Sequence, residues 1–134
     1  MKSILLLFLL FSTWSLKAQT DTTEISKPDS AIYFKPEIEA TYPGGVPYWQ
    51  RYLQRNLQYP SEAVRKNVQG TVVTKFIVDT NGAVHDVTAI SGPEELRAET
   101  IRIIKHVDIW VPAISNGKKV NSWKTQSVTY RLEN

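Results

Sequence analysis

The segment 70–91 constrains the fold more than any other part of this sequence. From Gly70 to Val78 two sets of side chains alternate along the chain, which is the period of a β-strand. Asp79-Thr80-Asn81-Gly82 follows, and an Asn-Gly pair tolerates the positive φ angles that a tight hairpin turn requires. Ala83 to Ser91 is then the returning strand. The sequence therefore predicts two antiparallel strands joined by a short turn.

Two segments, one on each side of this hairpin, show the spacing of amphipathic helices. Residues 46–57 and 93–107 each carry side chains at steps of three and four that form one stripe. Tyr59-Pro60 interrupts the first helix, because the residue before a proline is pushed out of the α region, and a short helix follows over 61–66. The stripes consist of Trp49, Tyr52, Leu53 and Leu57 in the first helix and of Leu96, Thr100, Ile103, Ile104 and Val107 in the second.

The chain ends in its longest predicted strand, over 120–132. Because successive side chains of a strand point to opposite faces, Trp123 lies on the face opposite Val128 and Tyr130. The order of elements is helix, short helix, strand, strand, helix, strand. This order predicts an α+β domain, in which a three-stranded antiparallel sheet carries two main helices packed on one face.

The first 18 residues have the composition of a secretory signal. A positive start is followed by an apolar run from Ile4 to Phe11, and Ala18 is a small residue that suits a cleavage site. The alternative is an uncleaved inner-membrane anchor, but a spanning helix needs about 20 predominantly apolar residues, and polar residues interrupt this run soon after Phe11. We therefore expect a signal peptide over 1–18, a flexible polar leader over 19–41 and one periplasmic domain over 42–134.

Charge and cysteine content exclude several classes of protein. Lys2 and Lys17 lie in the predicted signal, so the mature chain keeps 14 basic residues against 13 acidic ones, although the full chain carries a net charge of +3. Because the two signs are interspersed, no nucleic-acid groove is indicated. The chain has no cysteine, which excludes disulfides and thiol redox chemistry. The domain must be held together by its core, where we expect Phe76 and Trp110.

The sequence contains no pattern typical of catalysis or metal binding. His85 and His106 lack the spacing of metal ligands, and we interpret both as structural. Glu94, Glu95 and Glu99 cluster at the start of the second helix, where a solvated helix start explains them without a substrate. Nucleophile-elbow and phosphate-binding glycine patterns are absent. We expect a protein that is not an enzyme and has no cofactor, metal or small-molecule substrate.

Seven short matches, in order and with the correct spacing, resemble the C-terminal domain of TonB-type energy transducers. Together they cover roughly residues 42 to 132, and the Tyr-Pro-Gly-Gly start resembles the versions found in Bacteroidota-type bacteria. The matches are Tyr42-Pro43-Gly44-Gly45, Tyr59-Pro60 with Ala63, Gly70-Thr71-Val72, 76–84, Leu96-Arg97-Ala98-Glu99 with Arg102, 110–113 and Asn116-Gly117-Lys118.

The resemblance implies a binding function. Such domains bind the TonB box, a short N-terminal segment of outer-membrane transporters, which pairs as an added strand along the edge of the sheet. The implied partner is a TonB-dependent transporter, and the implied process is TonB-linked transmembrane transport. The alternative is a stand-alone periplasmic interaction or dimerisation protein that does not transduce energy, because a short polar leader stands where full transducers have a long Pro-rich spacer.

The final strand is the candidate binding edge. Its second half, Thr125 to Leu132, carries a single charge, Arg131, and an exposed strand with few charges favours pairing with another chain. The alternative is that this length serves the domain's own sheet or a homodimer. Tyr59-Pro60 matches the family segment beside the peptide site, but it is equally explained as a helix breaker with a buried ring. The candidate partner-binding residues are Tyr59, Pro60, Trp123, Thr125, Gln126, Ser127, Val128, Thr129, Tyr130 and Arg131.

Overall fold

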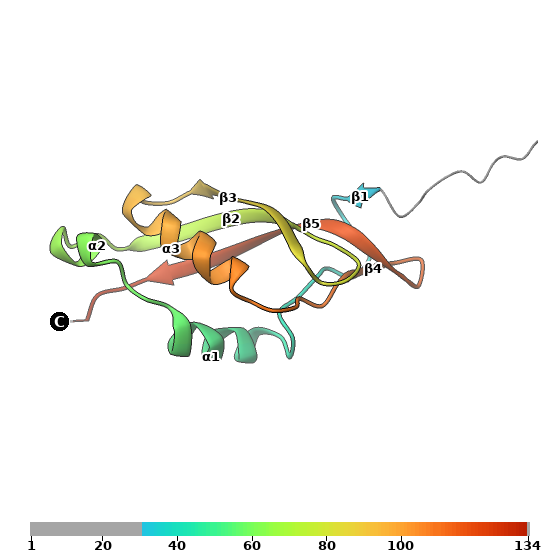
Figure 1. The fold of residues 1–134 in the computed structure, drawn as a ribbon, viewed down its shortest axis with the longest axis horizontal. Coiled ribbons are helices and arrows are strands. Elements are labelled where there is room, and N and C mark those ends of the chain that lie inside the picture. The colour runs from blue at the N-terminus through green and yellow to red at the C-terminus, as the bar shows by residue number, and fades with distance from the viewer. Residues whose placement is uncertain (1–30, 134) are drawn as a thin grey trace, which may run out of the picture.

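The computed structural model describes residues 31–133 and has the predicted α+β architecture. Figure 1 shows three long strands side by side, with α3 lying across them and α1 running beside the sheet. The elements are β1 (Ile32–Tyr33), α1 (Val46–Asn56), α2 (Ser61–Arg65), β2 (Gly70–Val78), β3 (Val84–Ser91), α3 (Glu94–Lys105), β4 (Ala113–Ser115) and β5 (Lys118–Tyr130). The predicted signal peptide and the first part of the leader lie outside the described residues.

The three predicted strands form the antiparallel body of the sheet, with β2 between β3 and β5. The register of β2 and β5 is continuous from the pair Gly70–Tyr130 to the pair Val78–Ser122. Two short strands add to this body, because β4 pairs with the start of β5 and β1 pairs with β5 in parallel. The sheet therefore has five strands, where the sequence predicted three. Strands of two or three residues are too short to show a period.

The helices lie close to their predicted positions. Gly45 precedes α1 with a φ of 85°, which glycine adopts without strain. Asn67 follows α2 with a φ of 60°, a left-handed conformation that asparagine tolerates at the end of a helix. The hydroxyl of Tyr52 in α1 donates to the carbonyl oxygen of Ile103 in α3 at 2.8 Å. This hydrogen bond joins the two main helices.

An aromatic cluster occupies the centre of the core. Trp110 is fully buried, and its ring centroid lies 5.2 Å from that of Phe76 and 5.6 Å from that of Trp49. Phe76 is also fully buried, so the structure confirms the core positions predicted for Phe76 and Trp110. The remaining large core side chains come from β2, β5 and α3: Val72, Val78, Val128, Tyr130, Leu96, Ile103 and Ile104.

The structure differs from the predicted domain boundary at Tyr42. Residues 31–41 lie against the domain, because β1 pairs with β5, and because Ile38 and Thr41 form bridges to Ile114 and Val111. These contacts are mainly main-chain hydrogen bonds, which polar composition does not reveal. The end of the predicted flexible leader is therefore part of the fold. Within 31–133, no helix has the length and apolar character that would be required to cross a membrane.

Candidate protein interface along strand β5

Strand β5 has one edge that is only partly paired. β2 covers one edge from Ser122 to Tyr130. On the opposite edge β1 pairs with Asn121 and Ser122, and among residues 31–133 no strand continues beside β5 from Trp123 to Tyr130. Figure 1 shows β5 as the outer strand along this half of the sheet. We call the stretch 123–130 the open edge. Unpaired main-chain groups of this kind form a template for an added strand.

The turn between β2 and β3 shows which main-chain groups face the open edge. The N–H of Asp79 donates to the carbonyl oxygen of Ala83 at 2.9 Å, so the main-chain groups of Asp79 point toward β3. Direction alternates along an antiparallel strand, so Thr74, five residues earlier, points toward β5 and its partner Gln126. In agreement, the Thr74 hydroxyl donates to the Gln126 carbonyl oxygen at 2.9 Å. The β5 residues whose main-chain groups point to the open edge are therefore Trp123, Thr125, Ser127 and Thr129.

The alternation along β5 also separates two faces of the predicted site. Thr125, Ser127 and Thr129 are exposed on the face away from the helices. Val128 and Tyr130 are buried on the helix face. Their side chains therefore point into the core and their main-chain groups point toward β2, so neither residue presents polar groups to an added strand. Gln126 and Arg131, the remaining predicted residues of this segment, are half-buried and exposed respectively.

Trp123 marks the start of the open edge. Its ring stacks on that of Phe34, with centroids 6.2 Å apart and an interplanar angle of 16°. The Lys75 ammonium lies 4.7 Å from the Trp123 centroid, within the range of a cation–π interaction. The sequence singled out Trp123 but missed Phe34 and Lys75, because this contact depends on the pairing of β1. The leader thus covers the ring of Trp123, although within 31–133 no strand pairs with β5 beyond Ser122 on this edge.

Tyr59 and Pro60 lie near the other end of β5 and help to build the domain. The Tyr59 hydroxyl donates to the carbonyl oxygen of Val68. Its ring packs edge-on against Tyr130, with centroids 5.5 Å apart and an interplanar angle of 84°. Pro60 has an extended conformation and directly precedes α2. These contacts support the structural interpretation of Tyr59-Pro60, although both side chains remain partly exposed.

Glu99 ties the segment before Tyr59 to α3. Its carboxylate is buried, accepts the Gln58 N–H at 2.7 Å and accepts two hydrogen bonds from Arg102 at 2.7 and 2.8 Å. Burial raises the pKa of Glu99, but these hydrogen bonds outweigh burial and hold the pKa below its usual value. The sequence predicted that the glutamates at the start of α3 are solvated. This holds for Glu94, whose side chain is 87% exposed, but not for Glu99, whose side chain is 9% exposed.

Asp79 and His85 organise the turn between β2 and β3. The Asp79 carboxylate accepts the N–H groups of Asn81 and Ala83, and it lies 2.7 Å from Nε2 of His85. Burial raises the pKa of Asp79, but the hydrogen bonds from His85 and the two N–H groups lower it overall. His85 is thus engaged in a turn, as the structural interpretation predicted. Among residues 31–133, no group of three His, Cys, Asp or Glu residues is arranged to hold a metal ion.

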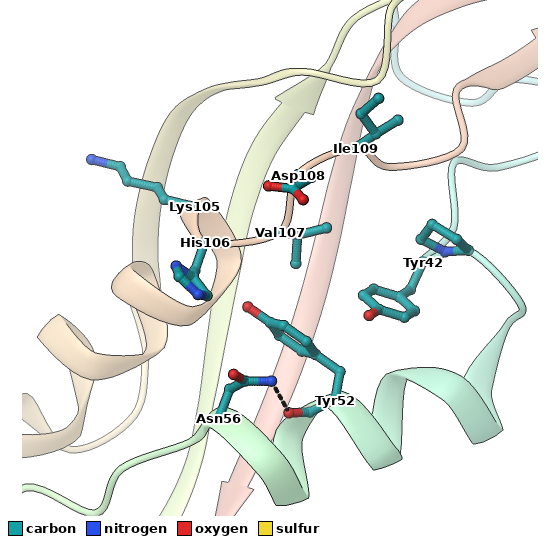
Figure 2. Close-up of a pocket in the computed structure, with 9 residues that line it drawn as sticks. Tyr42, Tyr52, Asn56, Lys105, His106, Val107, Asp108 and Ile109 are labelled. Carbon is teal, nitrogen blue, oxygen red and sulfur yellow. Dashed lines mark hydrogen bonds between the residues drawn. The ribbon is translucent and has the colours of Figure 1, made fainter.

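A hollow lies away from the open edge, between α1 and the end of α3. Figure 2 shows its lining side chains, with Tyr52 and Asn56 on one side and His106 and Asp108 on the other. Its volume is about 600 Å³. The central polar groups already have partners, because Tyr52 donates to Ile103 and the Asn56 amide donates to the Tyr52 carbonyl oxygen. Burial raises the pKa of Tyr52 to about 12, so its hydroxyl stays protonated. Tyr52 and Asn56 therefore serve the packing of the helices.

Comparison with known families gives a match, which covers most of the described domain. The family model described as Gram-negative bacterial TonB protein C-terminal matches residues 55–132. The matched segment includes α2, β2, β3, α3 and all of β5, and it covers more than half of the chain. No curated protein matches the chain.

Proposed function

We propose a peptide-binding function for this chain, which belongs to the family of Gram-negative bacterial TonB protein C-terminal domains. Domains of this family are periplasmic and interact with outer-membrane transporters. The specific proposal is that this chain binds TonB-box-like peptides of such transporters by adding the peptide as a strand beside β5. In this way it contributes to TonB-linked transmembrane transport.

The open edge of β5 is the observation that carries this proposal. Thr125, Ser127 and Thr129 direct their main-chain N–H and C=O groups away from β2, and within 31–133 no strand pairs with them. Main-chain pairing of this kind supplies affinity with little dependence on sequence, and side-chain pockets beside it supply selectivity. The exposed face of the three residues is polar and uncharged, so it does not repel an incoming strand.

The proposed roles of the site residues follow from their positions. Trp123, Thr125, Ser127 and Thr129 pair with the peptide through their main chains, and Gln126 contacts its side chains on the helix face. Arg131 follows the end of β5 and contacts the end of the peptide. Tyr59 and Pro60 hold the end of β5 in place through Tyr130. The alternative function uses the same edge to join two copies of the chain in a stand-alone periplasmic protein.

A proline substitution at Thr125 tests the proposal. Thr125→Pro removes one outward N–H, and its ring obstructs the position of an added strand. The ladder with β2 keeps its donors, because proline is tolerated where the N–H of an edge strand faces solvent. The loss of one net hydrogen bond, about 0.5–1.5 kcal/mol, corresponds to a loss of about 2- to 12-fold in affinity, and obstruction adds to it. Thr125→Val is the matched control, because it keeps both the N–H and the β-branched shape.

Calorimetry with synthetic peptides from the N-terminal segments of outer-membrane transporters of the same organism provides the measurement. We expect the wild type and Thr125→Val to bind with similar affinity and Thr125→Pro to bind more weakly, with all three melting as folded domains. Equal affinity of a folded Thr125→Pro variant would exclude this edge. A wild-type protein that binds none of the peptides but forms dimers in sedimentation would favour the stand-alone alternative.

A further inference from the structure

A small pocket lies beside Lys124 and Gln126, near the start of the open edge. Its volume is about 110 Å³, below the range of about 300–1,000 Å³ that is typical of sites for small molecules. A space of this size suits a single side chain. The pocket is lined by Thr41, Tyr42, Gly45, Val46, Trp49, Lys124 and Gln126.

The position of the pocket matches the face on which a bound peptide presents alternate side chains. Lys124 and Gln126 belong to the set of β5 side chains that includes buried Val128, on the helix face of the sheet. In a paired strand, a residue directly opposite another has its side chain on the same face, with Cβ atoms about 4.5–5.5 Å apart. A peptide residue opposite Lys124 or Gln126 therefore points toward this pocket.

The walls of the pocket favour an apolar occupant. Trp49, only 6% exposed, forms one wall, and Val46 stands at the mouth with 66% of its surface exposed. The charge of Lys124 has a partner on the protein, because its Nζ lies 3.8 Å from a carboxylate oxygen of Glu39. The Lys124 side chain is 14% exposed, so its methylenes contribute to the wall.

We propose that this pocket, which we call the Trp49 pocket, receives one aliphatic side chain of the partner strand and thereby selects the partner's sequence. The inference rests on the proposed function, because the added strand brings the side chain to the pocket. Trp49, Val46 and the methylenes of Lys124 are the selectivity-determining groups. Main-chain pairing along 125–129 holds the strand, and the Trp49 pocket fixes which residue of it lies opposite Lys124 or Gln126.

Four model peptides test the inference with the folded full chain. Each is a blocked seven-residue peptide with threonine at six positions and Ala, Val, Leu or Asp in the centre. We expect the Val and Leu peptides to bind about 10-fold or more tightly than the Ala peptide, as is typical of added methylenes in an apolar pocket, and the Asp peptide to bind most weakly. NMR shifts should appear at the Trp49 indole N–H and the Gly45 amide, together with the amides of the open edge.

Two variants connect the preference to the pocket. Val46→Asp places a carboxylate at the mouth of the pocket and should reduce the preference for Leu over Ala to less than about 3-fold, since an apolar side chain then meets a charge. The fold tolerates this change, because the first turn of α1 has no acidic residue and its N-terminus favours one. Gln50→Glu adds the same charge at an exposed position of the same helix outside the pocket, and it should keep the wild-type preference.

The possible results separate this inference from the proposed function. Equal affinities for all four peptides, with shifts along the open edge, would overturn the pocket and leave strand addition intact. Tightest binding of the Asp peptide would replace an aliphatic occupant with an acidic one that pairs with Lys124. If the NMR shift of the Trp49 indole N–H changes with protein concentration in the absence of peptide, the occupant of the pocket is a second copy of the chain. Absence of binding by every peptide would refute both proposals.

Discussion

Replacing Glu99 by glutamine should lower the stability of the domain in a way that depends on pH. The buried carboxylate accepts three hydrogen bonds, one from the Gln58 N–H and two from Arg102. Glutamine has one acceptor oxygen and an amide NH2 that cannot accept, so at least one of the three hydrogen bonds is lost, and the others are no longer made to a charged acceptor. The attachment of the connection that precedes Tyr59 to α3 is then weaker.

The geometry sets the size of the effect. The ion pair adds little, because the Arg102 side chain is 42% exposed and exposed pairs contribute about 0–1 kcal/mol. The hydrogen bond from Gln58 to a charged, buried acceptor contributes about 1.5–3 kcal/mol. We expect a net loss of about 2 kcal/mol, which lowers the melting temperature of a domain of about 100 residues by about 8–16 °C.

The sign of the pH dependence follows from the lowered pKa of Glu99. A carboxyl group whose pKa is lower in the folded than in the unfolded state stabilises the fold above the unfolded value, here about 4.5, and loses this contribution as the pH falls through the folded value. The difference in melting temperature between the wild type and Glu99→Gln should thus be constant from about pH 6 to 8 and shrink below about pH 4.5. Scanning calorimetry from pH 3 to 8 measures it.

The control for this experiment is Glu94→Gln in the first turn of α3. Glu94 is 87% exposed and lies 3.9 Å from Arg97, so its removal should change the melting temperature little at any pH. A Glu99→Gln difference that keeps its size at pH 3 would show that the charge of the carboxylate is not its source. A difference no larger than that of Glu94→Gln at pH 7 would refute the role given to the buried hydrogen bonds.

Two further predictions concern the core and the start of the mature chain. Phe76→Ala should destabilise the domain by about 3–5 kcal/mol, because it leaves a cavity beside Trp110, and urea unfolding measures the loss; an unchanged midpoint would contradict the packing of the ring. Mass spectrometry of the exported protein should find Gln19 as its first residue, with Ala18 the last residue removed. An intact Met1 on a protein that resists carbonate extraction from membranes would favour the anchored alternative.

The elements with a clear period could be predicted from the sequence. The alternation through Phe76 and the three- and four-residue spacing around Trp49 and Ile103 gave strands and helices close to their observed positions. β4 is too short to show a period, but the Asn116-Gly117 turn that joins it to β5 is a hairpin signal that could have revealed it. β1 could not be predicted in this way, because its pairing depends on where β5 already lies. The Trp49 pocket has the same origin, since Thr41, Trp49 and Lys124 meet only after folding.

The length of the turn between β2 and β3 decides which residues of β5 direct their main-chain groups to the open edge. The Asn81-Gly82 signal predicts a hairpin, and a two-residue loop of these residues would pair Thr80 with Ala83. The structure instead joins Asp79 to Ala83 across a three-residue loop, with Gly82 at a φ of 84°. A shift of one residue in the pairing register would turn each side chain to the other face of the sheet. It would also turn the main-chain N–H and C=O groups of each residue to the other edge of its strand.

The core therefore determines which residues of β5 are available to a partner. Because Phe76 is buried on the helix face, the even-numbered side chains of β2 point to that face. The continuous register pairs them with even-numbered residues of β5, and Val128 is accordingly buried on the same face. Ser127 then has its side chain on the exposed face and its N–H at the open edge. A proline at Ser127 would therefore remove no hydrogen bond from the ladder with β2. The number of main-chain N–H donors along the open edge can therefore change without loss of the core packing. The affinity for an added strand can change with it.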